Sequence, residues 1–339
     1  MTDSGAGSLT EAIRSGIAGS GIPNLSAGVQ RLMTAYRSGE VPDAPVMAAK
    51  TEAAAYAAYR MPATAAATSQ AVRELRRTLP GWSPATLLDL GAGTGAAAWA
   101  VADELPSVTS MTLLEQSAEA IKLGEAIFAA AAAPSLRAAT WQSWRLPAAP
   151  SGVQATADLA TAAYVLGELG PTQQSALIAL AASAAPVVLV VEPGTPAGHR
   201  RILAARAQLL GAGYVVAAPC PHQLDCPLAV EGDWCHFGAR LQRSAIHRQA
   251  KGVELSYEDE KYSYVAAVST KSRIDVASSS GRVVRRPQQR KGLVLLDLCL
   301  ADGKSKRELV SKSKGDVYRQ ARKVTWGGRW PPGDEGRPQ

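Results

Sequence analysis

The sequence predicts an α/β fold in which a doubly wound, mostly parallel sheet is preceded by a helical region and followed by a small basic β-rich module. Three observations lead to this prediction. Apolar segments of strand length alternate with helical ones from residue 81 onward, a glycine-rich turn follows the first of these segments, and residues 1–80 are rich in alanine without strand alternation. With 339 residues and 47% hydrophobic content, the chain can bury a sizeable core.

The first 80 residues are expected to be helical because apolar residues recur at helical spacing in Leu25–Tyr36 and Ala48–Tyr59. Pro62 is expected to interrupt this region, since the residue before a proline disfavours the helical conformation. One more helix is predicted over Gln70–Leu79. The predicted domains are the helical region 1–80, the sheet domain 81–270, the basic module 271–330 and a disordered tail 331–339.

Seven strands are predicted in the sheet domain, separated by helices wherever a parallel connection requires one. The predicted strands are Leu87–Leu90, Val108–Leu114, Ala138–Trp144, Ala157–Leu166, Val187–Glu192, Tyr214–Ala218 and Lys261–Ser269. The predicted helices are Ala96–Leu105, Ala118–Ala132, Gln173–Ala185 and Gly198–Leu210. Residues 219–260 are an insertion before the last strand, and an insertion of this length usually has a function.

The turn after the first strand has the character of a nucleotide-binding site. Gly91, Gly93 and Gly95 allow a tight turn and close approach of a ligand to backbone amides at a helix N-terminus. Glu115 ends the second strand, where a carboxylate can accept both ribose hydroxyls. This spacing also fits a dinucleotide site, so a nicotinamide-dependent oxidoreductase and a site that no longer binds its ligand remain alternatives.

Asp89, two residues before the three alternating glycines, resembles the first motif of class I S-adenosylmethionine-dependent methyltransferases. The resemblance implies that Asp89 faces the methionine part of the donor, that Glu115 binds its ribose and that the last two strands form an edge hairpin. Ligands bind at the carboxyl ends of such strands, so Tyr164–Glu168 and Glu192–Gly194 are expected to line the pocket, Tyr164 as a cofactor contact. Glu168 and Glu192 can equally be helix caps or surface carboxylates.

Three of the four cysteines, Cys220, Cys226 and Cys235, lie within sixteen residues of one another, and Cys299 follows in the basic module. Buried cysteines without a ligand are one interpretation, but such clustering favours a shared metal. Zinc could take four thiolates, or fewer with His222 or His236, and a [4Fe-4S] cluster suits thiolates from spaced loops. Either metal would tie the module to the sheet domain.

The positive charge is concentrated near the C-terminus. Residues 271–330 contain 16 Lys and Arg against 5 Asp and Glu, a net charge of +11, whereas residues 1–270 have a net charge of −3. This indicates a nucleic-acid partner, with a solvated segment as the alternative.

The basic module is predicted to be β-rich. Its predicted strands are Gly281–Arg286, Leu293–Leu300 and Lys304–Ser311, with a turn at Pro287–Gly292. Tyr318 and Trp326 could stack on bases, or belong to a core.

No secretory signal or membrane span is expected, so we predict a cytoplasmic protein. We also predict that it is a monomer.

Several stretches resemble a mitochondrial small-ribosomal-subunit-associated, methyltransferase-like family that also has bacterial members. They include Tyr59–Thr64, Cys220–Leu228, Asp233–Phe237, Glu258–Tyr264 and Tyr318–Lys323. The resemblance implies that the four cysteines hold a [4Fe-4S] cluster and that the protein binds small-subunit rRNA and the ribosomal precursor particle during assembly. It leaves two functions open, an assembly factor without catalysis and an active rRNA methyltransferase.

No catalytic residue is predicted. The fourth-strand exit reads Ala162-Ala163-Tyr164-Val165 in place of the Asn/Asp-Pro-Pro-aromatic turn of many amino-nitrogen methyltransferases, and no cysteine is placed as a pyrimidine nucleophile. Methyl transfer to an already nucleophilic atom can proceed by positioning alone, so an enzyme is not excluded.

Overall fold

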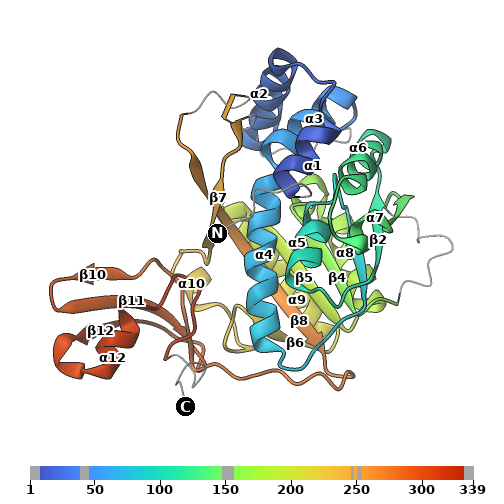
Figure 1. Ribbon diagram of the computed structural model, residues 1–339. Coiled ribbons are helices and arrows are strands. Elements are labelled where there is room, and N and C mark those ends of the chain that lie inside the picture. Colours follow the sequence, from blue (N-terminus) through green and yellow to red (C-terminus); the bar gives the residue numbers. More distant parts are fainter. Residues whose placement is uncertain (1–7, 39–45, 147–155, 246–247, 250–253, 332–339) are drawn as a thin grey trace.

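A computed structural model describes residues 8–38, 46–146, 156–245, 248–249 and 254–331. The predicted disordered tail lies outside these residues, apart from Pro331. The largest element is an eight-stranded sheet whose main path has the order β3-β2-β1-β4-β5-β8-β6, with β7 paired to β8 (Figure 1). Its strands are Thr86–Leu90 (β1), Ser110–Glu115 (β2), Thr140–Ser143 (β3), Leu159–Ala163 (β4), Val187–Pro193 (β5), Tyr214–Ala218 (β6), Phe237–Gln242 (β7) and Tyr257–Ser269 (β8).

Strands β1 to β5 run parallel, while β8 is antiparallel to both β5 and β6. This order, with the last strand inserted as a hairpin beside the fifth, is that of the class I methyltransferase fold, and it confirms the predicted α/β architecture. Alternate residues of β1 bury their side chains on opposite faces: Leu87 belongs to one apolar core, and Leu88 and Leu90 belong to the other.

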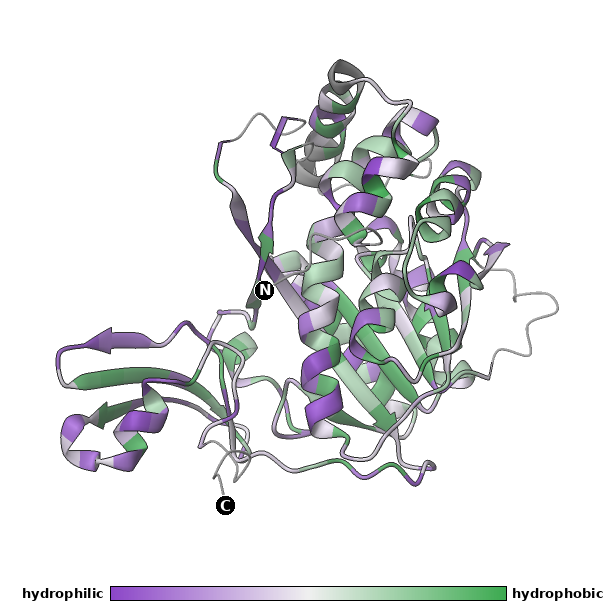
Figure 2. Cartoon of the chain, viewed as in Figure 1, coloured by the Kyte–Doolittle hydropathy of each residue, from purple (hydrophilic) through white to green (hydrophobic). Residues whose placement is uncertain are grey.

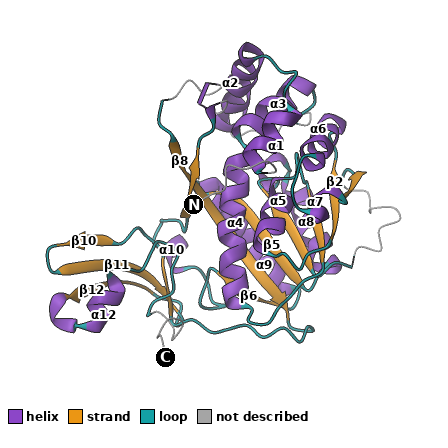
Figure 3. Cartoon of the chain, viewed as in Figure 1, coloured by secondary structure: helices purple, strands orange, loops and turns teal. Residues whose placement is uncertain are grey.

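Helices cover both faces of the sheet (Figure 3). The N-terminal helices with α5 and α6 pack against the Leu87 core, and α8 and α9 pack against the other. The helices are Leu9–Gly16 (α1), Ile22–Ser38 (α2), Lys50–Tyr59 (α3), Met61–Thr78 (α4), Ala96–Glu104 (α5), Ala118–Ala129 (α6), Pro134–Arg137 (α7), Pro171–Ala184 (α8), Pro196–Gly211 (α9), Pro227–Val230 (α10) and Asp316–Ala321 (α12), with 3-10 turns at Leu166–Glu168 and Lys312–Lys314. None of the described helices is long and apolar enough to cross a membrane.

Helix α4 begins nine residues earlier than predicted. Pro62 occupies its first turn, where the missing N–H would have no partner in any case, so the proline starts this helix while α3 ends at Tyr59. The buried side of α4 consists largely of alanine, threonine and one valine, which gave a weak apolar pattern in the sequence. The helix lies across the sheet and contacts β5, β6, β7 and β8 (Figure 1).

The insertion contains a strand that the sequence analysis did not predict. Strand β8 begins at Tyr257, four residues before its predicted start, and pairs with β7 from Tyr257 to Tyr262 before it pairs with β6 from Ala266 to Ser269. Strands β6 and β7 therefore lie one after the other along the same side of β8. The loop that carries Cys220, Cys226 and Cys235 connects them.

The C-terminal module is a separate four-stranded antiparallel sheet with a small core of its own (Figure 2). Its strands are Gly281–Val283 (β9), Gln288–Arg290 (β10), Leu293–Leu300 (β11) and Ser305–Ser311 (β12). The prediction of a turn at Pro287–Gly292 is wrong, because β10 within this range pairs with β11. In Figure 2, polar β10 and α12 lie around the apolar β11, so the charged residues surround a thin core.

Candidate functional site

The glycine turn joins β1 to α5 and can be built only from glycine at two of its positions. Gly91 and Gly95 have φ values of 71° and 91°. A Cβ atom added to Gly91 would lie 2.4 Å from a methyl carbon of Val165, and one added to Gly95 would lie 2.5 Å from the ring of Phe128. Both the backbone conformation and the space therefore exclude other side chains.

Glu115 fixes this turn to the end of β2. Its carboxylate accepts hydrogen bonds from the backbone N–H of Gly93, at 2.8 Å, and from that of Ser117, at 2.7 Å. Burial raises the pKa of Glu115, while these amides act in the opposite direction. Glu115 lines a pocket together with Gly91, Gly93 and Tyr164, at the carboxyl ends of the parallel strands. We call this the strand-end pocket.

Asp89 and Gly95 are not among the residues that line the strand-end pocket. Asp89 is buried beneath the turn, where the hydroxyl of Thr161 donates a hydrogen bond to its Oδ1 at 2.7 Å. Its Oδ2 has no hydrogen-bond partner in the described part of the chain, and burial raises its pKa to about 7. The Asp89 side chain is therefore separated from the strand-end pocket by the residues of the glycine turn.

Tyr164 has a φ of 60°, which is unusual for a residue other than glycine. Its hydroxyl donates to Glu260 Oε1 at 3.0 Å, and the same carboxylate accepts two hydrogen bonds from Arg60, at 3.0 and 3.3 Å. The Arg60 guanidinium also lies 5.3 Å from the centre of the Tyr164 ring. The sequence analysis missed Arg60 and Glu260 as parts of the site; both stand in stretches quoted for the family resemblance, which was the available signal.

The two acids at the exits of β4 and β5 have different environments. Glu192 is fully buried, forms an ion pair with Arg201 at 2.6 Å and accepts a hydrogen bond from the Leu166 amide. Glu168 lines the strand-end pocket. Burial, and then the charges of Glu115 and Glu192, raise the pKa of Glu168 to about 8. Neither residue is the exposed surface carboxylate that the sequence allowed.

All four cysteines line a second pocket, between α9, β8, the insertion and the module. Cys220 follows β6, Cys226 precedes α10, Cys235 precedes β7, and Cys299 lies in β11 of the other sheet. We call this the cysteine pocket. The structure thus brings three cysteines of the insertion together with Cys299 of the basic module.

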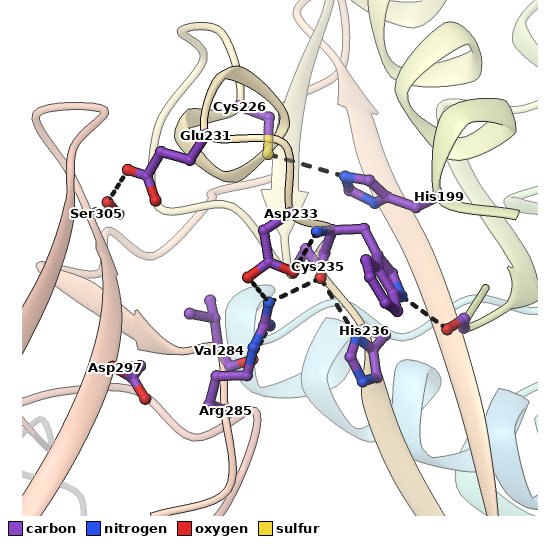
Figure 4. A network of polar contacts seen from close by, with 12 residues as sticks. His199, Cys226, Glu231, Asp233, Cys235, His236, Val284, Arg285, Asp297 and Ser305 are labelled. Atoms are coloured by element: carbon purple, nitrogen blue, oxygen red, sulfur yellow. Dashed lines mark hydrogen bonds and ion pairs between the residues drawn. The ribbon is translucent and has the colours of Figure 1, made fainter. Parts of the chain in front are cut away.

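The thiols of the cysteine pocket are close enough to influence one another. Burial, and then the other three cysteines, hold the pKa of Cys235 well above its usual value. His222 Nε2 lies 3.2 Å from the sulfur of Cys299. His199 Nε2 lies 4.0 Å from the sulfur of Cys226 (Figure 4). Among the described residues, no three His, Cys, Asp or Glu side chains are grouped as ligands of one metal ion.

An ion pair, a hydrogen bond and two contacts between aromatic rings join the insertion to the module next to Cys235. Arg285 pairs with Asp233 and also donates to the carbonyl of Trp234 (Figure 4). The ring of His236 stacks on Trp234, with ring centres 5.4 Å apart, and meets Trp326 edge to face at 5.2 Å. Trp326 is therefore part of this joint, which favours the core interpretation over base stacking.

Two arginines of the basic segment are engaged within the protein and do not face the expected nucleic-acid partner freely. Arg282 is only 2% exposed, and Arg285 is held by Asp233. Tyr318 packs partly buried against the module core. From β9 onward, the exposed basic residues of the module are Arg286, Arg290, Lys291, Lys304, Lys306, Arg307, Lys312, Lys314, Arg319, Arg322 and Lys323.

The strand order and the glycine turn define a protein with the class I methyltransferase fold. The family model described as mitochondrial small ribosomal subunit Rsm22 matches residues 50–331, and the chain belongs to this family. The predicted resemblance is thereby confirmed.

Among curated relatives, the human mitochondrial ribosome assembly protein METTL17 is 27% identical over 290 residues, 80% of this chain and 61% of that protein. A Schizosaccharomyces pombe Rsm22-cox11 tandem protein is 28% identical over 183 residues, 43% of this chain and 24% of that protein. The chain thus spans less than two thirds of these relatives.

Solved structures that resemble the chain include a putative RNA methyltransferase from Pyrococcus horikoshii, with 13% identity, a TM-score of 0.39 and coverage of 62% of this chain and 86% of that one. Another is the magnesium protoporphyrin IX methyltransferase of Synechocystis with S-adenosylmethionine bound, with 13% identity, a TM-score of 0.39 and coverage of 79% and 100%. The fold assignment rests on the strand order itself.

Proposed function

We propose that this protein is an assembly factor of the small ribosomal subunit that binds S-adenosylmethionine, a [4Fe-4S] cluster and rRNA, and whose role in assembly does not require methyl transfer. The observation that carries the proposal is the family match over residues 50–331, together with a human relative named as a ribosome assembly protein. The two pockets and the basic module support the individual ligands, one by one.

The strand-end pocket supports donor binding. It combines a glycine turn at a helix N-terminus with Glu115 at the end of the neighbouring strand, which is where a ribose is bound in nucleotide-binding α/β proteins. Although Glu115 already accepts two backbone hydrogen bonds, a carboxylate has further acceptor positions for hydroxyl groups. The predicted contact with Asp89 would have to pass through the turn or through water.

The cysteine pocket supports a metal centre. Four thiols from separate segments face one cavity, and the pocket also holds buried polar atoms without partners in the described chain: Nδ1 of His199, Nδ1 of His222 and Nε of Arg206. Such atoms are rare in folded proteins unless a ligand or water satisfies them. A bound cluster would take the four sulfurs as thiolates and link the module to the sheet domain. Zinc remains the alternative ligand.

The test of the metal assignment is purification of the full chain without oxygen. We expect a brown protein in which iron and acid-labile sulfide are present in about equal amounts, roughly four of each per chain. Replacement of Cys299 by serine should reduce both. Stoichiometric zinc without sulfide would contradict the [4Fe-4S] assignment and leave the rest of the proposal standing.

The basic module supports rRNA binding. Five exposed cations lie at the end of the module away from Arg282. Two hydrogen bonds bring their segments together: the Lys312 amide donates to the Gly292 carbonyl, and the Gln289 side chain donates to the backbone carbonyl of Arg322. None of the five forms an ion pair with a described residue, so their charge is available to phosphates. We call Arg290, Lys291, Lys312, Arg322 and Lys323 the distal cation patch.

An active rRNA methyltransferase is the second candidate, favoured by the intact glycine turn and Glu115. The two functions differ in their response to loss of donor binding. Cells that contain only a Glu115→Ala variant, shown to be folded by circular dichroism, should still mature their small subunits if the protein is a non-catalytic assembly factor. Loss of maturation together with one specific rRNA methyl group would establish the enzyme instead.

A further inference from the structure

Arg206 is a buried cation that forms no ion pair with a carboxylate of the residues that the structure describes. It lies on α9, is 6% exposed and lines the cysteine pocket. Its Nη2 donates to the carbonyls of His222, at 3.1 Å, and Leu224, at 2.7 Å. Its Nε has no hydrogen-bond partner among the residues that the structure describes. Within the described chain its guanidinium therefore contacts two carbonyl oxygens and the thiol of Cys220.

The other arginines in the protein interior differ from Arg206 in this respect. Arg282 pairs with Glu74, Arg60 with Glu260, and Arg201 with Glu192, at N–O distances of 2.7, 3.0 and 2.6 Å. No carboxylate within 4.0 Å of Arg206 is found in the described chain. Because removing a charge from water costs several kcal/mol unless an opposite charge compensates it, the position of Arg206 requires an explanation.

We infer that Arg206 supplies the counter-charge of an anionic four-thiolate metal centre in the cysteine pocket. This inference rests on the proposed metal site and deepens it, because it concerns the charge and the ligand set of the centre. Four thiolates carry more negative charge than either an oxidised iron–sulfur cubane or a zinc ion cancels. Zinc held by two thiolates and two imidazoles would be neutral and would leave Arg206 uncompensated.

A second buried arginine lies near the cysteine pocket, but its charge is balanced. Arg282 donates to the carbonyl of Pro219, next to Cys220, and also pairs with the carboxylate of Glu74 at 2.7 Å. Among the described residues that line the pocket, the arginine without a carboxylate partner is therefore Arg206.

A positive charge beside an iron–sulfur centre stabilises its reduced, more negative state and so raises its reduction potential. Two substitutions separate this effect from the hydrogen bonds of Arg206. Arg206→Gln retains an N–H donor and removes the charge, whereas Arg206→Lys retains the charge. Arg200→Gln is the matched control, because Arg200 is exposed on the same helix.

The test uses the full chain, reconstituted without oxygen with iron and sulfide and titrated with dithionite, which supplies one electron per cluster. Paramagnetic resonance of the reduced cluster gives the midpoint potential. We expect a more negative potential in Arg206→Gln, with values near that of the wild type in Arg206→Lys and Arg200→Gln. Equal potentials in all four proteins would overturn the inference, and so would an Arg206→Lys variant that behaves like Arg206→Gln.

Failure of the cluster proposal has a different signature. If the wild type binds zinc and no sulfide, competition with a chelator replaces the redox titration. The inference then predicts at least tenfold weaker zinc binding in Arg206→Gln and near wild-type binding in Arg206→Lys. Equal zinc affinities, or a wild type that binds neither metal, would overturn it. If Arg206→Gln retains no cluster, retention in Arg206→Lys supports a charge effect, and loss in both indicates a packing role.

Discussion

The guanidinium of Arg282 lies 2.7 Å from the carboxylate of Glu74, although the two residues are 208 positions apart in the chain. Arg282 belongs to the first strand of the module and Glu74 to helix α4. The same guanidinium donates to the carbonyls of Pro219, just before Cys220, and Gly327, near the end of the described chain. One buried side chain thus joins helix α4, the loop that carries Cys220 and both ends of the module.

Replacement of Arg282 by methionine should destabilise the protein by about 3 to 5 kcal/mol, because it leaves two buried carbonyl groups without their partner and leaves Glu74 with its exposed partner Arg77 only. Urea unfolding followed by circular dichroism measures the effect. The control is Arg307→Met, since Arg307 forms a solvent-exposed ion pair with Asp297 that should contribute little to stability. Similar losses in the two variants would contradict the central role of Arg282.

Replacement of Glu115 by alanine should weaken binding of S-adenosylmethionine by roughly 1 to 3 kcal/mol, because hydrogen bonds from the ribose to a charged acceptor would be lost. Titration calorimetry with the donor and its demethylated product measures this. Glu125→Ala, an exposed change on α6, should have no effect. Unchanged affinity in Glu115→Ala, or preference of the wild type for a nicotinamide cofactor, would refute the donor assignment.

The free energy of unfolding should depend on the ionisation of Glu168. Its pKa is raised from 4.5 to about 8 by burial and by the charges of Glu115 and Glu192, so the folded protein binds a proton more tightly than the unfolded chain. The stability that the protonated Glu168 side chain contributes to the folded state is fully present below pH 4.5 and is lost as the pH rises through about 8.

Between pH 5 and pH 8.5, the free energy of unfolding of Glu168→Gln should therefore increase by at least about 1 kcal/mol relative to that of the wild type. Urea unfolding over this range measures the difference between the two proteins, which cancels the similar contribution of Asp89, whose pKa is about 7. Glu125→Gln provides the exposed control. A constant difference across the range would show that Glu168 is not shielded from water.

Charge reversal in the distal cation patch should weaken rRNA binding and flatten its salt dependence. In the Lys291→Glu, Lys312→Glu double variant we expect the slope of log affinity against log salt concentration to become shallower by roughly 1.5 to 2, because two phosphate contacts, and the counterions that each releases, are lost. Fluorescence anisotropy with a small-subunit rRNA fragment at several salt concentrations measures this. The control, Lys50→Glu with Lys122→Glu, makes the same change of net charge at exposed positions of α3 and α6, outside the module. Equal slopes in the two double variants would place the RNA surface elsewhere.

Much of the sheet could be predicted because parallel strands buried on both faces leave continuous apolar segments such as Val187–Glu192, and because only glycine fits the turn at Gly91 and Gly95. The arginines of the module show what could not be predicted. Arg282 and Arg285 stand in the same basic segment as exposed Arg286, and the sequence offers no local sign that Glu74 and Asp233 hold the first two.

Glu260 was missed for a related reason. It stands in a run of charged residues, Glu258–Lys261, which is typical of a solvated strand, and its burial follows from packing against α4 and Tyr164. Strand β7 was missed because its pairing partner is the extended part of β8 within the insertion. In each case the information lies in contacts between distant segments, which a single sequence does not display.

Strand β8 contributes to both pockets within four residues. Glu260 holds the hydroxyl of Tyr164 in the strand-end pocket, and the hydroxyl of Ser263 donates to the carbonyl of Cys235 at 2.7 Å in the cysteine pocket. A shift of this strand by one residue would exchange the sides of both side chains at once. An insertion or deletion in this part of β8 should therefore disturb both pockets at once, because a single strand register positions Glu260 and Ser263.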